Sequence, residues 1–389
     1  VNQVHIVKDD TPVYAEDTVE FIGDPVLMLV GPDEQTVERL AQQVDVSYEP
    51  LPAVLDVRQS DTVFFDYQFG RGDVDTAFAQ ADKVYQEDFS TGYQEQAYLE
   101  TQGMIAAYQN GKLTIHGSLQ CPYYVHGALV KALGLTPDRV RVLQDVTGGG
   151  FGGKEAYPSI LACQVAVAAY KAGGKAVRVI YGRREDMEYT SKRHPSECTY
   201  RVAVKDGRVT AMDIDVLFNA GAFTTLSAVV LQRGIIASPG VYHLEHLRVR
   251  GRAMKTNTVP TGAFRGFGAP QTFFAVEMMM QHIAADMGEE PLAFKMRHLV
   301  KQGDATSTDG RYHFPVPLPA MVGEVEAMSD YAAKRTAYQQ PQNGRYRRGI
   351  GTSLWFHGAG FTGSGERDHI KAVTRLHKTP DGRVEVLAS

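Results

Sequence analysis

Residues 145–155 limit most strongly what this chain can fold into. The segment reads Asp-Val-Thr-Gly-Gly-Gly-Phe-Gly-Gly-Lys-Glu, with five glycines in the six residues 148–153. Glycine lets the backbone turn sharply and lets a bulky group approach the main chain. The segment follows a strand-like run, 139–143, and precedes an apolar segment, 159–172, that is predicted to be helical. Because N–H groups that open a helix attract anionic or oxo ligands, the segment is predicted to form a binding loop.

The chemistry of this loop leaves three interpretations open. It fits the phosphate motif G-x-x-x-x-G-K-[ST] as far as Lys154, but Glu155 stands where a hydroxyl should bind Mg²⁺ and would repel a phosphate. It also fits the dinucleotide motif G-x-G-x-x-G from Gly148, although the chain does not supply the mainly parallel βαβ context that this motif needs. The third interpretation is a glycine-lined wall for a different cofactor, with Phe151 and Glu155 facing a substrate.

Composition narrows the class of protein. The 389 residues suffice for two or three domains, and the net charge of −5 gives no reason to expect nucleic acid or a membrane surface as partner. No run approaches the roughly 20 apolar residues that span a bilayer. Three cysteines without CxxC spacing exclude a Cys₄ iron–sulfur cluster or zinc site held by this chain alone. They also argue against a disulfide framework, which favours a reducing compartment, the cytoplasm.

The first part of the chain has the pattern of a small βαβ unit. An apolar strand at 26–30, a helix at 33–44 and a strand at 44–49 end in the proline-containing segment 49–52. We therefore predict a small N-terminal α+β domain over residues 1–60. A polar connector is predicted over residues 61–85, with one short helix at 74–81.

The rest of the chain predicts mixed sheets with packed helices, so the fold class is α+β. Asn110-Gly111, Asp206-Gly207 and Asp381-Gly382 are hairpin turn signals. Strands are predicted at 104–108, 112–119, 139–143, 176–181, 199–204, 209–218, 246–254, 347–356 and 370–389. Further helices are predicted at 124–133, 159–172, 272–287, 292–301 and 319–337. The last strand ends without a turn or cap, which predicts that the polypeptide is one piece of a larger assembly or a truncated chain.

Three further segments carry unusual side chains. A second glycine turn, 262–271, resembles the first in having an aromatic residue between glycines and a helix directly after it. Residues 226–234 place Arg233 after an almost wholly apolar run, and a half-buried arginine needs an anionic partner. Gln120 ends the strand before the first loop and offers one amide side chain.

Taken together, these segments resemble the molybdenum-cofactor subunit of the xanthine dehydrogenase and xanthine oxidase family, the molybdenum hydroxylases. The resemblance covers nearly the whole chain and is densest from about residue 90 to 305. Five segments occur in the family's order: 98–102, 148–155, 191–195, 226–234 and 263–271. The resemblance implies a larger molybdopterin-binding domain over 86–340 and the start of a further, incomplete molybdopterin-binding domain over 341–389.

The resemblance also implies how the cofactor is held. The cofactor would be molybdopterin with molybdenum, in its plain or its cytosine dinucleotide form, and this chain would supply no direct metal ligand. Gln120 would hydrogen-bond the apical oxo ligand, and the other contacts would come from the backbone of the two glycine turns. The cofactor-binding residues implied are Gln120, Gly150, Phe151, Gly152, Phe264, Arg265 and Gly266.

The substrate implied is a purine, with xanthine first, or a related N-heterocycle. Glu155 would hydrogen-bond the ring, and Arg233 would stabilise the negative charge that develops opposite the attacked carbon. Phe267 would stack on the substrate face, with Phe361 as a candidate second stacking residue. The chain would hydroxylate an electron-poor carbon with oxygen derived from water and pass electrons to iron–sulfur clusters and FAD on partner subunits.

One part of the family's site is not found in this sequence. The family's general base is a glutamate in a Gly-Glu-Pro-Pro-like segment near the far C-terminus, and Glu366, the nearest look-alike, is interpreted as a loop carboxylate. A second molybdopterin-binding chain, or a missing C-terminal half, is therefore expected to complete the site. His194 is expected to be structural because no second histidine lies at metal-ligand spacing.

Two other hypotheses remain. The chain could be a nucleotide-binding module that uses the loop from Gly148 to Lys154, although Glu155 and the second glycine turn argue against it. It could also be a non-catalytic remnant of a molybdenum hydroxylase that binds partners but no cofactor, because the general base is missing.

Overall fold

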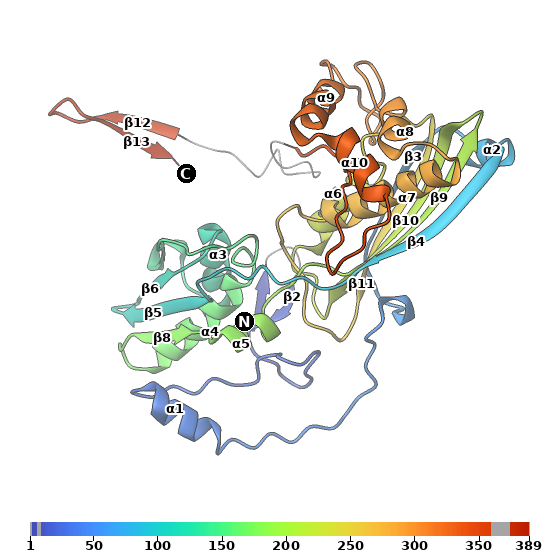
Figure 1. The fold of residues 1–389 in the computed structure, drawn as a ribbon. Coiled ribbons are helices and arrows are strands. Elements are labelled where there is room, and N and C mark those ends of the chain that lie inside the picture. The colour runs from blue at the N-terminus through green and yellow to red at the C-terminus, as the bar shows by residue number, and fades with distance from the viewer. Residues whose placement is uncertain (1, 6–8, 359–373, 389) are drawn as a thin grey trace. The chain divides into compact units, whose positions relative to one another are not determined.

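The computed structural model describes residues 2–5, 9–358 and 374–388. These residues form two compact units, Val1–Trp355 and Phe356–Ser389. The first unit contains a five-stranded and a four-stranded sheet, each with helices packed on it (Figure 1). Both sheets mix parallel and antiparallel strands, so the predicted α+β class with mixed sheets is confirmed.

The five-stranded sheet has the strand order β3-β11-β10-β9-β4. All neighbours are antiparallel except β10 and β11, which are parallel. Its strands are β3 (Val63–Arg71), β4 (Lys83–Thr91), β9 (Ser196–Lys205), β10 (Arg208–Gly221) and β11 (His246–Lys255). Asp206 and Gly207 join β9 to β10 with φ of 49° and 69°, and these positive values confirm the predicted hairpin turn.

The two faces of this sheet differ in chemistry. Along β11, Arg248, Arg250 and Arg252 alternate with buried residues and pair with aspartates, so one face carries ion pairs. The other face is covered by helices, and a Cβ on Gly251 would lie 2.3 Å from Ile235 of the helix above it. The helices on this side are α6 (Ser227–Ala237), α7 (Ala269–Asp286) and α8 (Pro291–Arg297). Helix α2 (Val74–Ala79) lies on the ion-paired face, where its Asp75 pairs with Arg248.

The four-stranded sheet has the order β7-β6-β5-β8 and carries its own apolar core. Its elements are β5 (Gly103–Gln109), β6 (Lys112–Gly117), α3 (Pro122–Leu133), β7 (Val140–Gln144), α4 (Pro158–Lys171), β8 (Val177–Ile180) and the 3-10 turn Pro137–Arg139. Asn110 and Gly111, with φ of 51° and 73°, form the predicted turn between β5 and β6. The first glycine segment connects β7 to α4, as the sequence predicts, and α5 (Arg183–Tyr189) follows β8.

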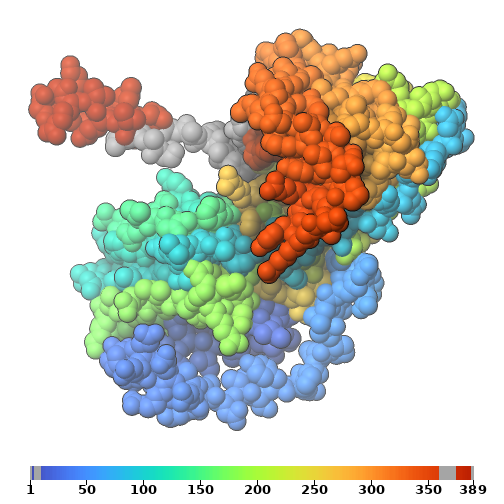
Figure 2. Space-filling view, viewed as in Figure 1, coloured from blue at the N-terminus to red at the C-terminus, as the bar shows by residue number. Residues whose placement is uncertain are grey.

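The predicted N-terminal βαβ unit is wrong in its strands. The helix forms as α1 (Glu34–Ala41), but residues 26–30 and 44–49 pair with no described strand. Apolar residues alone do not make a strand, because the backbone N–H and C=O groups need a partner. Figure 2 shows this part of the chain in blue, and most of residues 26–56 is exposed. The strands observed before α1 are β1 (Gln3–His5) and β2 (Asp9–Pro12).

Three other expectations need correction. The segment 61–85 contributes edge strand β3 and the start of β4 rather than a simple connector, and the 3-10 turn Val57–Gln59 precedes it. The helix predicted at 319–337 is two helices, α9 (Leu318–Ser329) and α10 (Tyr331–Gln339), because Asp330 adopts a left-handed φ of 51° between them. Residues 347–356 form no strand.

The second unit contains one hairpin. Strands β12 (Thr374–Lys378) and β13 (Val384–Ala388) pair antiparallel, and the turn at Asp381-Gly382 is confirmed. No helix in the described ranges of the chain is long and apolar enough to cross a membrane.

Candidate active site

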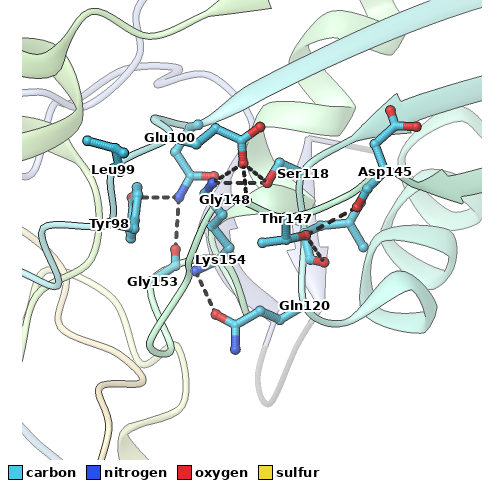
Figure 3. Close-up of polar contacts among 12 residues, drawn as sticks. Tyr98, Leu99, Glu100, Ser118, Gln120, Asp145, Thr147, Gly148, Gly153 and Lys154 are labelled. Carbon is cyan, nitrogen blue, oxygen red and sulfur yellow. Dashed lines mark hydrogen bonds and ion pairs between the residues drawn. The ribbon is translucent and has the colours of Figure 1, made fainter.

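The first glycine loop is fastened to the end of β6 by Gln120. Its side-chain oxygen Oε1 accepts hydrogen bonds from the backbone N–H groups of Gly152, at 3.0 Å, and Lys154, at 3.2 Å. Its own N–H donates to the carbonyl of Lys154 at 2.7 Å. The Gln120 amide nitrogen donates to no described residue and points away from the loop in Figure 3. Gln120 therefore orients the loop with one end of its amide, while the other end has no partner among the described residues.

Lys154 fixes the inner side of the same loop. Its side chain is 0% exposed, and its ammonium donates to Glu100 Oε2 at 2.8 Å and to Ser118 Oγ at 2.9 Å (Figure 3). Glu100 Oε2 also accepts from the Gly148 N–H at 2.7 Å. Although partial burial opposes it, these hydrogen bonds lower the pKa of Glu100 to about 2. Both ends of the glycine loop are thus anchored to one carboxylate.

A buried polar layer supports the loop from below. The Gln102 amide donates to the Gly153 carbonyl at 2.8 Å and to the Tyr98 hydroxyl at 2.9 Å. Tyr98 in turn donates to Asp186 at 2.6 Å. Burial first, and the neighbouring Asp186 second, raise the pKa of Tyr98 above its usual range, so its hydroxyl stays a donor. This layer leaves the loop backbone little freedom to move.

Bare glycines are required where the two glycine turns meet. A Cβ on Gly152, whose φ is +99°, would lie 2.6 Å from the Ala263 carbonyl oxygen of the second turn. A Cβ on Gly150 would lie 2.3 Å from Gln120 Oε1. The contact continues through a hydrogen bond of 2.9 Å from the Arg265 N–H to the Phe151 carbonyl. The structure therefore brings together two segments that are more than a hundred residues apart in the sequence.

Backbone donors remain available along both turns. The N–H groups of Gly150, Phe151 and Gly266 donate to no residue in the described part of the chain. Phe151 holds a strained φ of 51°, and its ring is 47% exposed. Free N–H groups on a backbone kept rigid from behind are suited to an oxo or anionic ligand.

Glu155 is the unusual acid of the site. Its half-buried carboxyl forms no hydrogen bond or ion pair with any described residue, and burial raises its pKa to about 7. Cys121 lies close enough for the Glu155 charge, after burial, to contribute to raising the pKa of its thiol to about 12. A carboxyl that titrates near neutral pH and has no partner is a candidate binding group.

Arg233, on α6, lies close to Phe267 of the second turn. The Arg233 guanidinium lies 6.0 Å from the centre of the Phe267 ring, and it forms no ion pair with a described residue. Phe267 packs on Ala156, Leu226 and Ala263, so it links the start of α6 with both glycine turns. The cluster also places Phe267 beside the neighbour of Glu155. The segments that carry the three residues predicted to contact substrate therefore meet at one packed junction.

The second turn is held against α6 by backbone contacts. Gly268 has a φ of +93°, and a Cβ there would lie 2.2 Å from the Val230 carbonyl. Behind the turn, Arg193 stacks on the ring of Phe264 at 3.8 Å and donates to the Arg265 carbonyl at 3.0 Å. The Arg265 side chain is exposed.

His194 lies next to this arrangement but is fully buried. Its Nε2 is 2.8 Å from Ser227 Oγ, and burial, then Arg193, lower its pKa to about 3. It is therefore neutral and ties the strand region before β9 to α6. Phe361 and Glu366 lie outside the described residues. No cluster of acidic, histidine or cysteine side chains in the described segments could hold a metal ion.

Residues 56–299 match the family model of the molybdopterin cofactor-binding domain. The chain belongs to this family. It is 32% identical over 343 residues to a xanthine dehydrogenase of Emericella nidulans. The matched region covers 85% of this chain and 25% of that protein. It is 28% identical to aldehyde oxidase 2 of Rattus norvegicus, over 97% of this chain and 29% of that protein. The expected membership of the xanthine dehydrogenase family is confirmed.

The fold of this molybdopterin-binding chain has a solved counterpart. An aldehyde oxidoreductase from Desulfovibrio gigas superposes with a TM-score of 0.86 and 27% identity, covering 97% of this chain and 42% of that one. The chain therefore spans about a quarter of the length of the xanthine dehydrogenase, and under half of the structural relative.

The geometry also tests the nucleotide-binding interpretation of the first loop. In a phosphate loop, the lysine must reach the bound phosphates. Here Lys154 is fully buried and paired with Glu100, so it points away from any ligand of the loop. The free N–H groups and the bare glycines instead fit an anionic, oxo-bearing cofactor.

Two supporting features were not predicted. Glu100 and Ser118 both lie in segments that the sequence singles out, but nothing in their spacing shows that they meet Lys154. Arg193 belongs to the third of the five family-like segments, and its role depends on contacts with Gln94 and Arg265, 99 and 72 residues away. The position of Lys154 directly after a run of glycines was the one sequence signal that could have suggested a buried side chain holding the loop.

Proposed function

We propose that this chain forms one wall of a molybdenum hydroxylase site that acts on a purine or a related N-heterocycle. The observation that carries the proposal is the unpaired Glu155 carboxyl, with a pKa of about 7, on the same packed junction as Arg233 and Phe267. An acid and a cation without partners, close to an aromatic ring, suit a flat ligand with both donor and acceptor groups.

One set of residues in the chain binds the cofactor, and another set binds the substrate. The molybdenum cofactor, when bound, supplies the activated water-derived oxygen and accepts the electrons. Gln120, through its free amide nitrogen, binds an oxo group, and the N–H groups of Gly150, Phe151 and Gly266 orient the cofactor. Phe264 and Arg265 supply further backbone contacts, as the family resemblance implies.

The substrate is held by side chains. Phe267 stacks on the ring, and Glu155 in its protonated form donates a hydrogen bond to a ring nitrogen or oxygen. Arg233 stabilises negative charge that develops on the ring during attack, in a site where electrostatic stabilisation is worth a few kcal/mol. The pair of Glu155 and Arg233 favours xanthine or another purine over an aldehyde. Phe361 is the proposed second stacking residue.

The general base and the electron-transfer cofactors come from further polypeptide segments. The general-base glutamate belongs to a second molybdopterin-binding chain or to a C-terminal half, and iron–sulfur and FAD subunits carry the electrons away. The cofactor is molybdopterin, in its plain or its cytosine dinucleotide form. Three free cysteines favour a reducing compartment, the cytoplasm.

Substitution of Arg233 tests the assignment in the complex purified with its partner subunits. We expect Arg233→Ala to lower kcat/KM for xanthine by roughly a hundredfold or more, because one stabilising cation is lost. Molybdenum and pterin content should stay at the wild-type level. The matched control is Arg250→Ala, which removes an exposed arginine that pairs with Asp66 on the outer sheet face.

Two outcomes would refute parts of the proposal. An equal loss of activity and cofactor in Arg233→Ala would contradict a role in the reaction. A wild-type complex with its neighbouring subunits that contains no molybdenum, or shows no hydroxylase activity, would favour the non-catalytic remnant.

A further inference from the structure

Arg193 is a buried cation behind the second glycine turn. Its side chain is 6% exposed, and its guanidinium stacks on the Phe264 ring at 3.8 Å. Nε donates to Gln94 Oε1 at 2.6 Å, and Nη2 donates to the Arg265 carbonyl at 3.0 Å. All its partners are neutral. No carboxylate of the described residues pairs with it.

The charge of Arg193 is therefore uncompensated within the described chain. Its third nitrogen, Nη1, is buried and has no hydrogen-bond partner. Burial lowers the pKa of Arg193 to about 10, which still leaves the guanidinium charged at neutral pH. A buried charge without a counter-ion destabilises a protein. Its neighbours Lys192 and His194 differ, because Lys192 pairs with Glu95 at 2.6 Å and His194 is neutral.

Arg193 also fixes the direction of a free backbone donor. The peptide group that joins Arg265 to Gly266 is planar and trans, so its C=O and N–H point in opposite directions. Because Arg193 holds the Arg265 carbonyl, the Gly266 N–H points away from Arg193. That N–H donates to no described residue, and Gly266 has a φ of +94° that favours glycine.

We propose that Arg193 is a positioning residue for the anionic pterin cofactor, which it serves by orienting the Gly266 N–H and by supplying a positive charge that the cofactor neutralises. The inference rests on the proposed function, and it adds a residue outside the set that the family resemblance implies. Hydrogen bonding of the Arg265 carbonyl to a cation also polarises the peptide, which makes the Gly266 N–H a stronger donor. The direct contact to the cofactor is made by Gly266.

A purely structural role for Arg193 makes a different prediction. If the residue only packs on Phe264, its replacement weakens the cofactor-free and cofactor-loaded forms equally. If its charge is neutralised by the cofactor, replacement lowers chiefly the stability that loading adds. The comparison of the two forms therefore separates the two roles, even for a variant that is less stable.

The experiment uses the whole complex, prepared with cofactor and from a host unable to make molybdopterin. We compare wild type, Arg193→Gln and Arg193→Lys by melting temperature in both forms, and by the rate of pterin release after dilution into mild urea. The control is Arg201→Gln, which removes an arginine that stacks on Phe78 at 4.8 Å but pairs with Asp213.

We expect Arg193→Gln to release pterin at least about tenfold faster than wild type, because a charge-assisted contact is lost. The rise in melting temperature that cofactor loading produces should also be smaller in this variant. Arg193→Lys, which keeps the charge, should lie between wild type and Arg193→Gln. Arg201→Gln should match wild type in its rate of pterin release and in its rise in melting temperature on cofactor loading.

Equal losses of melting temperature in both forms, with unchanged pterin release, would overturn the role of Arg193 and leave the proposed function standing. Arg193→Lys that releases pterin as fast as Arg193→Gln would overturn the assignment of charge. A wild-type complex that binds no pterin would overturn the role together with the proposed function.

Discussion

The ion pair between Lys154 and Glu100 predicts an unequal response to removing either partner. The Lys154 side chain is 0% exposed, whereas that of Glu100 is 44% exposed. Glu100→Gln leaves a buried ammonium that water cannot reach, and such a charge costs about 3 kcal/mol of unfolding free energy. Lys154→Met leaves a carboxylate that water can reach, so we expect a loss of only about 1 kcal/mol.

Urea unfolding of the chain at pH 7 measures both values. The double variant should be close to Lys154→Met alone, because the buried charge is then absent. Glu324→Gln, an exposed acid on α9 without a described partner, is the control and should stay within about 0.5 kcal/mol of wild type. A Lys154→Met variant less stable than Glu100→Gln would refute the reasoning from burial.

The same pair predicts how stability depends on pH. The pKa of Glu100 falls from 4.5 in the unfolded chain to about 2 in the fold, so its contribution is complete above pH 4.5 and is lost as the pH falls through 2. Because Glu100 is partly exposed, this contribution is reduced by solvent screening, to about 1–2 kcal/mol. Glu100→Gln should lack this part of the acid dependence. An unchanged pH profile below 4.5 would show that the pair is not formed.

Two further predictions concern the loop itself. Glu155→Gln should stabilise the chain by about 2 kcal/mol at pH 8.5 and leave its stability unchanged at pH 4.5. Because the pKa of Glu155 is raised to about 7 in the fold, ionisation of this carboxyl opposes folding above pH 4.5, and does so fully above pH 7. Equal urea midpoints of variant and wild type at pH 8.5 would contradict this. Gly152→Ala should lose about 2–3 kcal/mol and its pterin, because its Cβ would meet the Ala263 carbonyl at φ +99°. Gly134→Ala, with φ +62° and open space, is the control, and an equal loss there would assign the effect to backbone strain alone.

Local chemistry made much of this fold predictable. The turns at Asn110-Gly111 and Asp206-Gly207 follow from residues that accept positive φ, which is a property of two adjacent residues. The helices that cover the sheets follow from apolar periodicity. The strands predicted at 26–30 and 44–49 fail because a strand depends on a neighbouring backbone, which the sequence of the segment does not contain. The break at Asp330 is also local, but aspartate adopts left-handed φ only in some contexts.

The candidate site was predictable only in its unusual residues. The glycines, Glu155, Arg233 and Phe267 stand out because their local chemistry conflicts with ordinary motifs, and the structure places their segments at one junction. The supports did not stand out. Arg193 is an ordinary arginine until Gln94, Phe264 and Arg265 surround it.

Lys154 and Glu155 are adjacent charged residues in the loop, and only the first is paired within the described chain. Lys154 turns inward, is paired by Glu100 and holds the loop, so its charge is satisfied before any ligand binds. Glu155 has no described partner, and its burial disfavours the ionised form, an effect that a hydrogen-bonding ligand would offset. The same division recurs behind the second turn, where Lys192 is paired with Glu95 and its neighbour Arg193 has no ion-pair partner among the described residues. Because an unpaired charge stands beside a paired one at both turns, the pattern is better explained by a bound ligand than by incomplete packing.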